Sequence, residues 1–472
     1  IECYQAILEN DTRNGKALEA LERIYFRGEQ WPELFGVYEK MVDIASGDEG
    51  MSDCYARMAR IASDALKDRD KSIELWNKVI DLRGEDPMAL SALAGLYEGA
   101  QMWRELVDIL ERTVRITEVP EDRIPLHKRL GAIWSQKLER ERESLDAWQE
   151  VLQIDSRDID ALRAIAQLYR QLQQPDDLVE TLHRLIEAGQ LSNMSIDEIR
   201  EAYAELGKLY AEQLMRPEDA IASWRKVFEY NKKDFRALAA LETLFNQEAR
   251  WEDAVDVIEK RVKLLEKSDE KIAELIKVGR IWEDQVADAA AAADAYERVL
   301  GIDKHNMTAS VQLENIYRGR ANWSQLSDLL LARVEFPANT PHNRIEIYQN
   351  IARIYEDNMT DRESAFVVLQ AAFREDYSVD STARELERLA SVTGKWGDLL
   401  GEYTQSVTQI ADLKARADLW VKIGRWYAEH LGRIDYAIAS QQQALALDAN
   451  HKEALTNLVE CYRKTQQWQE LV

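Results

Sequence analysis

The stretch WVKIGRWY occupies residues 420–427, and two close variants of it, LIKVGRIW and YQNIARIY, occupy residues 275–282 and 348–355. In each copy, apolar residues stand at the first, fourth and eighth positions, and a small residue, Gly or Ala, stands at the fifth. This spacing places the apolar residues on one face of an α-helix. Recurrence of the same helix face along a sequence is typical of a tandem repeat array.

Two further series of residues give the length of the repeating unit. One series is Trp31, Trp103, Pro175, Trp251, Trp323, Trp396 and Trp468, and the other is Tyr4, Trp76, Trp148, Trp224, Tyr296, Leu369 and Gln441. Both series advance in steps of 72, 72, 76, 72, 73 and 72 residues. The repeating unit is therefore about 72 residues long, and the one longer step predicts a longer loop near residues 188–196. The constant place of the Trp series beside a turn predicts a structural anchor.

Each unit divides into two helical hairpins. In the first hairpin, apolar residues recur at helical spacing on both sides of the polar turn RGEQ at 27–30, and the second hairpin repeats the pattern. The chain has only 8 Pro and 19 Gly, and 46% of its residues are hydrophobic. A single hairpin cannot bury its apolar stripe, so neighbouring hairpins must stack on both sides. The sequence predicts an all-α chain.

With two helical hairpins in each unit, the chain resembles the tetratricopeptide repeat family, whose helix–turn–helix of 34 residues carries the pattern W-x2-L-G-x2-Y. Trp420, Ile423, Gly424 and Tyr427 match that pattern, and 203–210 matches it again through its L-G-x2-Y part. The resemblance implies an α-solenoid, a right-handed superhelix of tandem repeats, over residues 1–472. Partial repeats at both ends, IECYQAILEND at 1–11 and WQELV at 468–472, lead us to expect a longer natural protein.

The first hairpins depart from the family pattern. Glutamates stand where the family has a small residue, namely Glu22, Glu242, Glu314 and Glu387. A solenoid of the HEAT type is the structural alternative. The family's carboxylate clamp of Lys and Asn is not reproduced, because Arg or Lys mostly stands where that clamp has Asn.

Charge and cysteine content exclude several classes of protein. The formal net charge is −25, which argues against a nucleic-acid binder and against a peripheral protein on anionic lipid. No apolar run approaches the length of a membrane span. The three cysteines, Cys3, Cys54 and Cys461, match no metal or disulfide spacing. Such sparse cysteines favour a reducing compartment such as the cytoplasm.

A basic residue recurs beside the small residue of the second hairpins, although the core does not require one. Nine of the twelve positions immediately after or two before that small residue are basic. They are Arg57, Arg60, Arg129, Lys208, Lys277, Arg280, Arg353, Lys422 and Arg425. The resemblance implies that these positions face a groove. Arginine holds carboxylates bidentately, so we expect acidic segments of partner proteins to bind there.

Local pairing is the alternative explanation for the same residues. An acid follows four residues later in Arg60–Asp64, Lys208–Glu212, Arg280–Asp284, Arg353–Asp357 and Arg425–Glu429. Such pairs are neighbours on a helix and contribute about 0.2–0.5 kcal/mol each. If they form, they neutralise much of the basic ladder.

No catalytic, cofactor or metal motif occurs. The six histidines lack ligand spacing, and the chain has no P-loop, no G-x-G-x-x-G and no G-x-S-x-G. We therefore expect a non-catalytic scaffold or adaptor that binds proteins or peptides and needs no cofactor, as one component of a larger complex. Two alternatives remain open: the substrate-recruiting region of a larger enzyme, such as a kinase or glycosyltransferase, and a self-assembling array.

Overall fold

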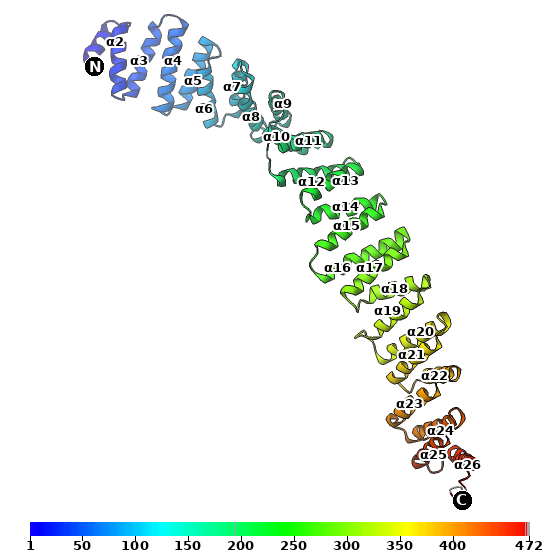
Figure 1. Ribbon diagram of the computed structural model, residues 1–472. Helices are drawn as coiled ribbons and strands as arrows, with labels where there is room; N and C mark the ends of the chain where they lie inside the picture. The colour runs from blue at the N-terminus through cyan, green and yellow to red at the C-terminus, as the bar shows by residue number, and fades with distance from the viewer. Residues whose placement is uncertain (193, 468, 470–472) are drawn as a thin grey trace. The chain divides into compact units, whose positions relative to one another are not determined.

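In the computed structural model, which describes residues 1–192, 194–467 and 469, the chain is a succession of α-helices without a strand among those residues. Figure 1 shows the helices following one another as antiparallel neighbours. The all-α prediction is confirmed. The chain divides into two compact units, Ile1–Leu244 and Phe245–Val472.

The first unit holds the helices from α1 to most of α14. Their bounds are α1 (Glu2–Asn10), α2 (Gly15–Arg27), α3 (Trp31–Ile44), α4 (Gly47–Asp64), α5 (Arg69–Arg83), α6 (Pro87–Gly99), α7 (Trp103–Ile116), α8 (Pro120–Gln136), α9 (Glu141–Ile154), α10 (Ile159–Leu172), α11 (Pro175–Leu191), α12 (Ile196–Glu212), α13 (Pro217–Tyr230) and α14 (Phe235–Gln247).

The second unit continues the same pattern. Its helices are α15 (Trp251–Leu264), α16 (Ser268–Arg280), α17 (Ala289–Ile302), α18 (Met307–Gly319), α19 (Trp323–Val334), α20 (Pro341–Arg353), α21 (Arg362–Glu375), α22 (Asp380–Thr393), α23 (Trp396–Ser406), α24 (Leu413–Glu429), α25 (Ile434–Leu447) and α26 (Lys452–Lys464). Two π-helical turns, η1 (Ile281–Val286) and η2 (Ile354–Asn358), follow α16 and α20, and a short 3-10 helix, η3 (Val407–Gln409), follows α23.

The opening stretch shows why these residues form a hairpin. Asp412 caps the N-terminus of α24 by accepting hydrogen bonds from the amides of Lys414 and Ala415. In the repeated apolar face of α24, Ile423 is buried, and Trp420 and Tyr427 are partly buried against the same core. The neighbour that α24 contacts most is α25. The same one-sided burial recurs along both units, so each hairpin depends on its neighbours for a core.

Close approach of the two helices requires the small residue of the second hairpins. A Cβ on Gly131 would lie 2.4 Å from Nε1 of Trp148, and one on Gly207 would lie 2.5 Å from Nε1 of Trp224. Real side chains do not approach that closely, so an alanine there would force the helices apart. The aromatic series from the sequence therefore fills the space that these glycines leave.

The turns within the hairpins share one backbone geometry. A residue with positive φ stands two positions before the second helix of every hairpin from α2–α3 to α24–α25, and most of these residues are not glycine. They are Glu29, Lys67, Gln101, Glu139, Gln173, Met215, Ala249, Ala287, Ala321, Thr360, Gly394 and Gly432. Each Trp of the described series begins the helix that follows and is half-buried, as expected of an anchor. Trp468 lies outside the described residues, together with most of the WQELV stretch.

The insertion near residues 188–196 differs from the expected longer loop. Residues 188–191 continue α11, which reaches Leu191, and α12 begins at Ile196. The extra residues therefore mainly lengthen a helix, because Ala188 and Gly189 are buried there. The single array over 1–472, its 72-residue unit and its right-handed superhelix stay predictions.

Candidate functional site

The nine predicted basic residues lie on the first helices of the second hairpins, and the structure divides them into two rows. The paired row stands two positions before the small residue and contains Arg57, Arg129, Lys277 and Lys422. The exposed row stands immediately after it and contains Arg60, Lys208, Arg280, Arg353 and Arg425, all of which are exposed.

Every side chain of the paired row contacts a carboxylate of the protein itself. The Nη1 atom of Arg57 lies 2.6 Å from Oε1 of Glu22, and Nη2 of Arg129 lies 2.5 Å from Oε2 of Glu98. Lys277 pairs with Glu274 at 2.7 Å, and Lys422 pairs with Glu387. All but the Lys277 pair join consecutive hairpins, so most of this row serves the stacking of the array.

Two of the first-hairpin glutamates form the same three-residue cluster. In the first unit, Tyr38 donates its hydroxyl to Glu22 at 2.7 Å, 16 residues apart, and Arg57 reaches the same oxygen from 35 residues away. In the second unit, Tyr403 donates to Glu387 at 3.0 Å, and Lys422 completes the cluster, with the same separations of 16 and 35 residues. The carboxylates are thus half-buried and satisfied.

The environment of these tyrosines favours their neutral, hydrogen-bonded form. Burial first, and then the hydrogen bond to Glu22, raise the pKa of Tyr38 to about 12. Burial and the charge of Glu387 likewise raise the pKa of Tyr403 above its ordinary value. Both tyrosines therefore stay protonated, and remain hydrogen-bond donors, across the physiological pH range.

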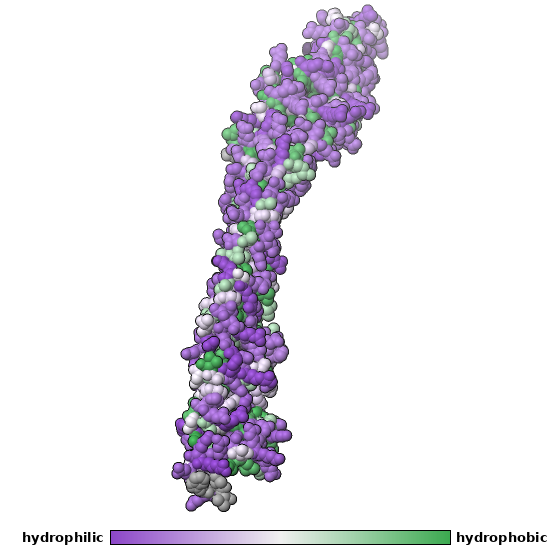
Figure 2. All heavy atoms as spheres, turned by 90° about the vertical axis from the view of Figure 1, so that its right-hand side faces the viewer, coloured by the Kyte–Doolittle hydropathy of each residue, from purple (hydrophilic) through white to green (hydrophobic). Residues whose placement is uncertain are grey.

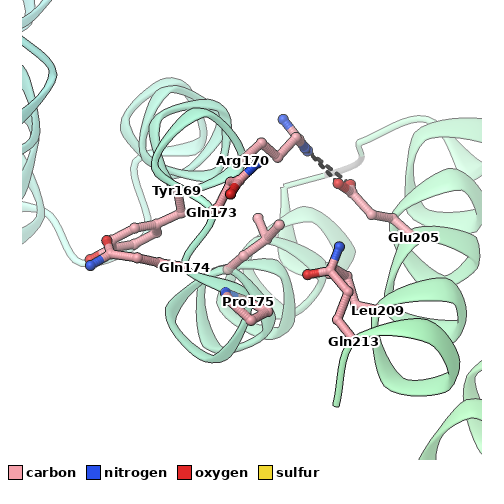
Figure 3. A pocket seen from close by; sticks show the side chains of 9 residues that line it. Tyr169, Arg170, Gln173, Gln174, Pro175, Glu205, Leu209 and Gln213 are labelled. Atoms are coloured by element: carbon pink, nitrogen blue, oxygen red, sulfur yellow. Dashed lines mark hydrogen bonds and ion pairs between the residues drawn. The ribbon is translucent and has the colours of Figure 1, made fainter. Parts of the chain in front are cut away.

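One hairpin reverses the signs of the same contact. Glu205 stands at the paired-row position of α12. Arg170 of α10 donates two hydrogen bonds to it, from Nε to Oε1 at 2.5 Å and from Nη2 to Oε2 at 2.8 Å. Figure 3 shows this pair at the rim of a cavity of about 530 Å³, with Tyr169 and Gln213 among the side chains that line it. The sign can be exchanged because the contact stabilises the hairpin stack either way.

The exposed row does not form the predicted i,i+4 pairs. Among the described residues, none of its five members lies within 4.0 Å of the acid four positions later. After Arg280 and Arg353 the chain enters the π-helical turns η1 and η2. A π-helix bonds i to i+5, so an acid at i+4 is rotated away from the position that it takes on an α-helix. The local-pairing explanation is therefore wrong for this row.

Other contacts of the exposed row are sparse. Arg425 lies 3.6 Å from Oε1 of Glu453 on α26, and the guanidinium of Arg60 contacts Sδ of Met88 at 2.6 Å. Lys208, Arg280 and Arg353 form no ion pair within 4.0 Å in the part of the chain that the structure describes. These three side chains are exposed and therefore keep their hydrogen-bonding capacity directed to solvent.

Sequence reasoning missed the partners of the paired row, although a signal was present. Oppositely charged residues on consecutive hairpins are 35 residues apart in the pairs Arg57–Glu22, Arg170–Glu205 and Lys422–Glu387. The pairs Arg163–Glu198 and Arg236–Glu201 have the same separation. A search at that spacing finds the partners of Arg57 and Lys422, whereas Arg129 and Glu98 are 31 residues apart and Lys277 and Glu274 are three residues apart.

Metal and membrane features are absent from the described part of the chain. No group of three or more His, Cys, Asp or Glu side chains there is placed to hold a metal ion. None of the described helices is long and apolar enough to cross a membrane. The face seen in Figure 2 is mainly hydrophilic, with small apolar patches between charged side chains.

Comparison with known proteins adds a family match over one hairpin. The tetratricopeptide repeat model matches residues 89–124, which span most of α6, all of α7 and the start of α8. No curated protein matches the chain.

Among solved structures, the chain is similar to Naa15/Naa10 bound to HypK-THB, with 11% identity, a TM-score of 0.32, and 100% of this chain and 94% of that chain covered. It is similar to the C-terminal part of a repeat protein from Cytophaga hutchinsonii, with 16% identity, a TM-score of 0.29, and coverage of 54% and 99%. It is also similar to a tetratricopeptide repeat protein from Parabacteroides merdae, with 16% identity, a TM-score of 0.27, and coverage of 65% and 100%.

The family match falls on a hairpin whose architecture recurs from α2–α3 onward, with the same turn geometry. The L-G-x2-Y spacing, the glycine under its aromatic and the tandem stacking agree with that match. The chain is therefore a long all-α array of helical hairpins, and the stretch at residues 89–124 is similar to the tetratricopeptide repeat.

Proposed function

We propose that this chain is a non-catalytic scaffold that binds acidic segments of partner proteins or peptides through its exposed row. The supporting observation is the division of the basic residues. The paired row uses its charges on carboxylates of the protein, whereas the exposed row stays largely without them. Repeat arrays offer extended surfaces for binding of this kind.

The energetics agree with a binding role for the exposed row. A solvated arginine contributes little to folding, so its repetition at one register position needs another reason. Arginine binds carboxylates with two parallel hydrogen bonds. In the second unit three members of the row, Arg280, Arg353 and Arg425, occupy equivalent positions on α16, α20 and α24. A partner with several acids would engage them together, as one component of a larger complex.

Affinity capture from host lysate tests the proposal. The triple variant R280E/R353E/R425E is compared with the parent, and circular dichroism verifies that both are helical. A matched control, K304E/R320E/R463E, makes the same charge change at exposed residues of the same unit outside the row. We expect the row variant to lose specific proteins that the parent and the control retain. An identical set of captured proteins for all three chains would contradict the proposal.

A further inference from the structure

A cavity of about 450 Å³ lies in the first unit where α2, α3 and α4 meet. Its apolar part is formed by Phe26 and Ile61. The Phe26 side chain is 60% exposed, and its ring stands edge-on to Trp31 at 5.9 Å. A large aromatic side chain that is fixed in place and left open to water favours the binding of an apolar group.

The charged residues that line this cavity are three arginines, Arg23, Arg57 and Arg60, and one carboxylate, that of Glu22. Glu22 is already engaged by Arg57 at 2.6 Å. Arg60 contacts the sulfur of Met88, which is a weak acceptor. Arg23 is exposed and forms no ion pair within 4.0 Å among the described residues. The cavity wall therefore carries an excess of positive charge on a chain whose net charge is −25.

We propose that this cavity binds an acidic peptide segment of a partner protein that carries one aromatic or aliphatic side chain between its acids. The apolar side chain would lie on Phe26 and Ile61, and the flanking carboxylates would meet Arg60 of α4 and Arg23 of α2. Charge complementarity selects this occupant, because guanidinium groups on two different helices flank one apolar surface. The inference rests on the proposed function, since Arg60 belongs to the exposed row.

Isothermal titration calorimetry with defined peptides tests this proposal. The probe is the blocked peptide acetyl-Asp-Glu-Phe-Glu-Asp-amide, which has no terminal charges. One comparison peptide replaces the acids by Asn and Gln, and another replaces Phe by Ser. We expect the parent chain to bind the probe, and to bind each comparison peptide at least about ten-fold more weakly, because each lacks one of the two recognised features.

Variants of the chain assign the binding to the cavity. R23Q/R60Q and, separately, F26S should weaken the probe at least about ten-fold, whereas R104Q/R142Q, which removes two exposed arginines of the same unit outside the cavity, should leave binding unchanged. Absence of binding to the parent, equal binding by R23Q/R60Q, or equal loss in the R104Q/R142Q control would overturn the proposal. Circular dichroism verifies the fold of each variant.

A second copy of this chain is the competing occupant. Concentration-dependent light scattering by the parent that F26S abolishes would identify that occupant and overturn the peptide proposal. The test is also separable from that of the proposed function. Failure of the probe leaves the capture experiment on Arg280, Arg353 and Arg425 untouched, because those residues lie in the second unit.

Discussion

At the scale of single residues, the glutamates of the first hairpins explain much of the polar structure. Glu22, Glu314 and Glu387 each stand where a small residue would be expected, and each accepts charged hydrogen bonds from a neighbouring element. Glu314 receives Nη1 of Arg333 at 2.5 Å and Nη2 of Arg318 at 2.9 Å. A half-buried carboxylate without such partners would be strongly destabilising.

Acid pH should weaken the array through Glu314. Burial alone raises the pKa of its carboxyl, but the hydrogen bonds from Arg318 and Arg333 lower that pKa by more, so the net shift is downward. A carboxylate whose folded pKa is depressed contributes stability above its unfolded pKa and loses it as pH falls through the folded pKa. We expect Glu314→Gln to cost about 1–3 kcal/mol at pH 7 and to flatten the loss of stability below pH of about 5.

Urea unfolding at several pH values between neutral and acidic measures this effect, because its midpoint and slope give the free energy of unfolding. Arg318 and Arg333 remain in the variant, so the difference reports the charge of one carboxyl. A variant that loses stability with falling pH as steeply as the parent would contradict the assignment.

The polar contacts of single residues were the least predictable part of the candidate site. The nine basic positions can be found in the sequence because they recur at fixed offsets from the small residue. Their partners, however, depend on which hairpin packs beside them. Arg57 and Arg60 differ by less than one helical turn, yet one pairs with Glu22 and the other does not. Local spacing favours i+4 pairs, whereas the structure joins side chains 35 residues apart.

At the scale of elements, close helix packing in α8, α12 and α16 depends on the glycine that lies against an aromatic side chain of the next helix. Nothing lies within 4 Å of a Cβ built on Gly95, an exposed glycine inside α6, whereas one built on Gly207 would lie 2.5 Å from Trp224. The two positions are matched, since both are glycines within a helix of the first unit. They separate the effect of packing from the intrinsic cost of glycine in a helix.

Alanine at these two glycines should have opposite effects. Gly207→Ala should lower the free energy of unfolding by about 1–3 kcal/mol, because Trp224 and the helix that carries it must shift. Gly95→Ala should raise it by about 1 kcal/mol, because alanine favours the helix and meets no neighbour. Chemical denaturation of both variants beside the parent measures the two values, and effects of the same sign would refute the packing argument.

Elements were more predictable than contacts, for a physical reason. Helical spacing repeated in every unit predicts the helices and the turn at 27–30, and the structure contains both. The insertion near 188–196 was expected to form a loop, but burial of Ala188 and Gly189 favours a longer helix. The π-helical turns after α16 and α20 carry no signal in apolar periodicity alone, and they displace the acids expected beside Arg280 and Arg353.

At the scale of the whole molecule, basic residues at two neighbouring register positions differ in their contacts: the paired row contacts carboxylates of the protein, and the exposed row largely does not. We propose that the paired row stabilises the stacked hairpins and that the exposed row binds partners. Stability in a repeat array is close to a sum of local and nearest-neighbour terms. Loss of a contact between hairpins should therefore be visible in the unfolding of the chain, whereas loss of a solvated arginine should not.

Thermal unfolding of two charge-matched variants, each beside the parent, tests this claim most directly. R57Q/R129Q/K422Q removes the three members of the paired row that join consecutive hairpins, and K208Q/R280Q/R353Q removes the three members of the exposed row that form no ion pair among the described residues. We predict a lower unfolding midpoint for the paired-row variant, because each carboxylate left behind costs about 1–3 kcal/mol, and an unchanged midpoint for the exposed-row variant. An exposed-row variant that unfolds as early as the paired-row variant would show that both rows serve the fold, and would remove the basis for binding through the exposed row.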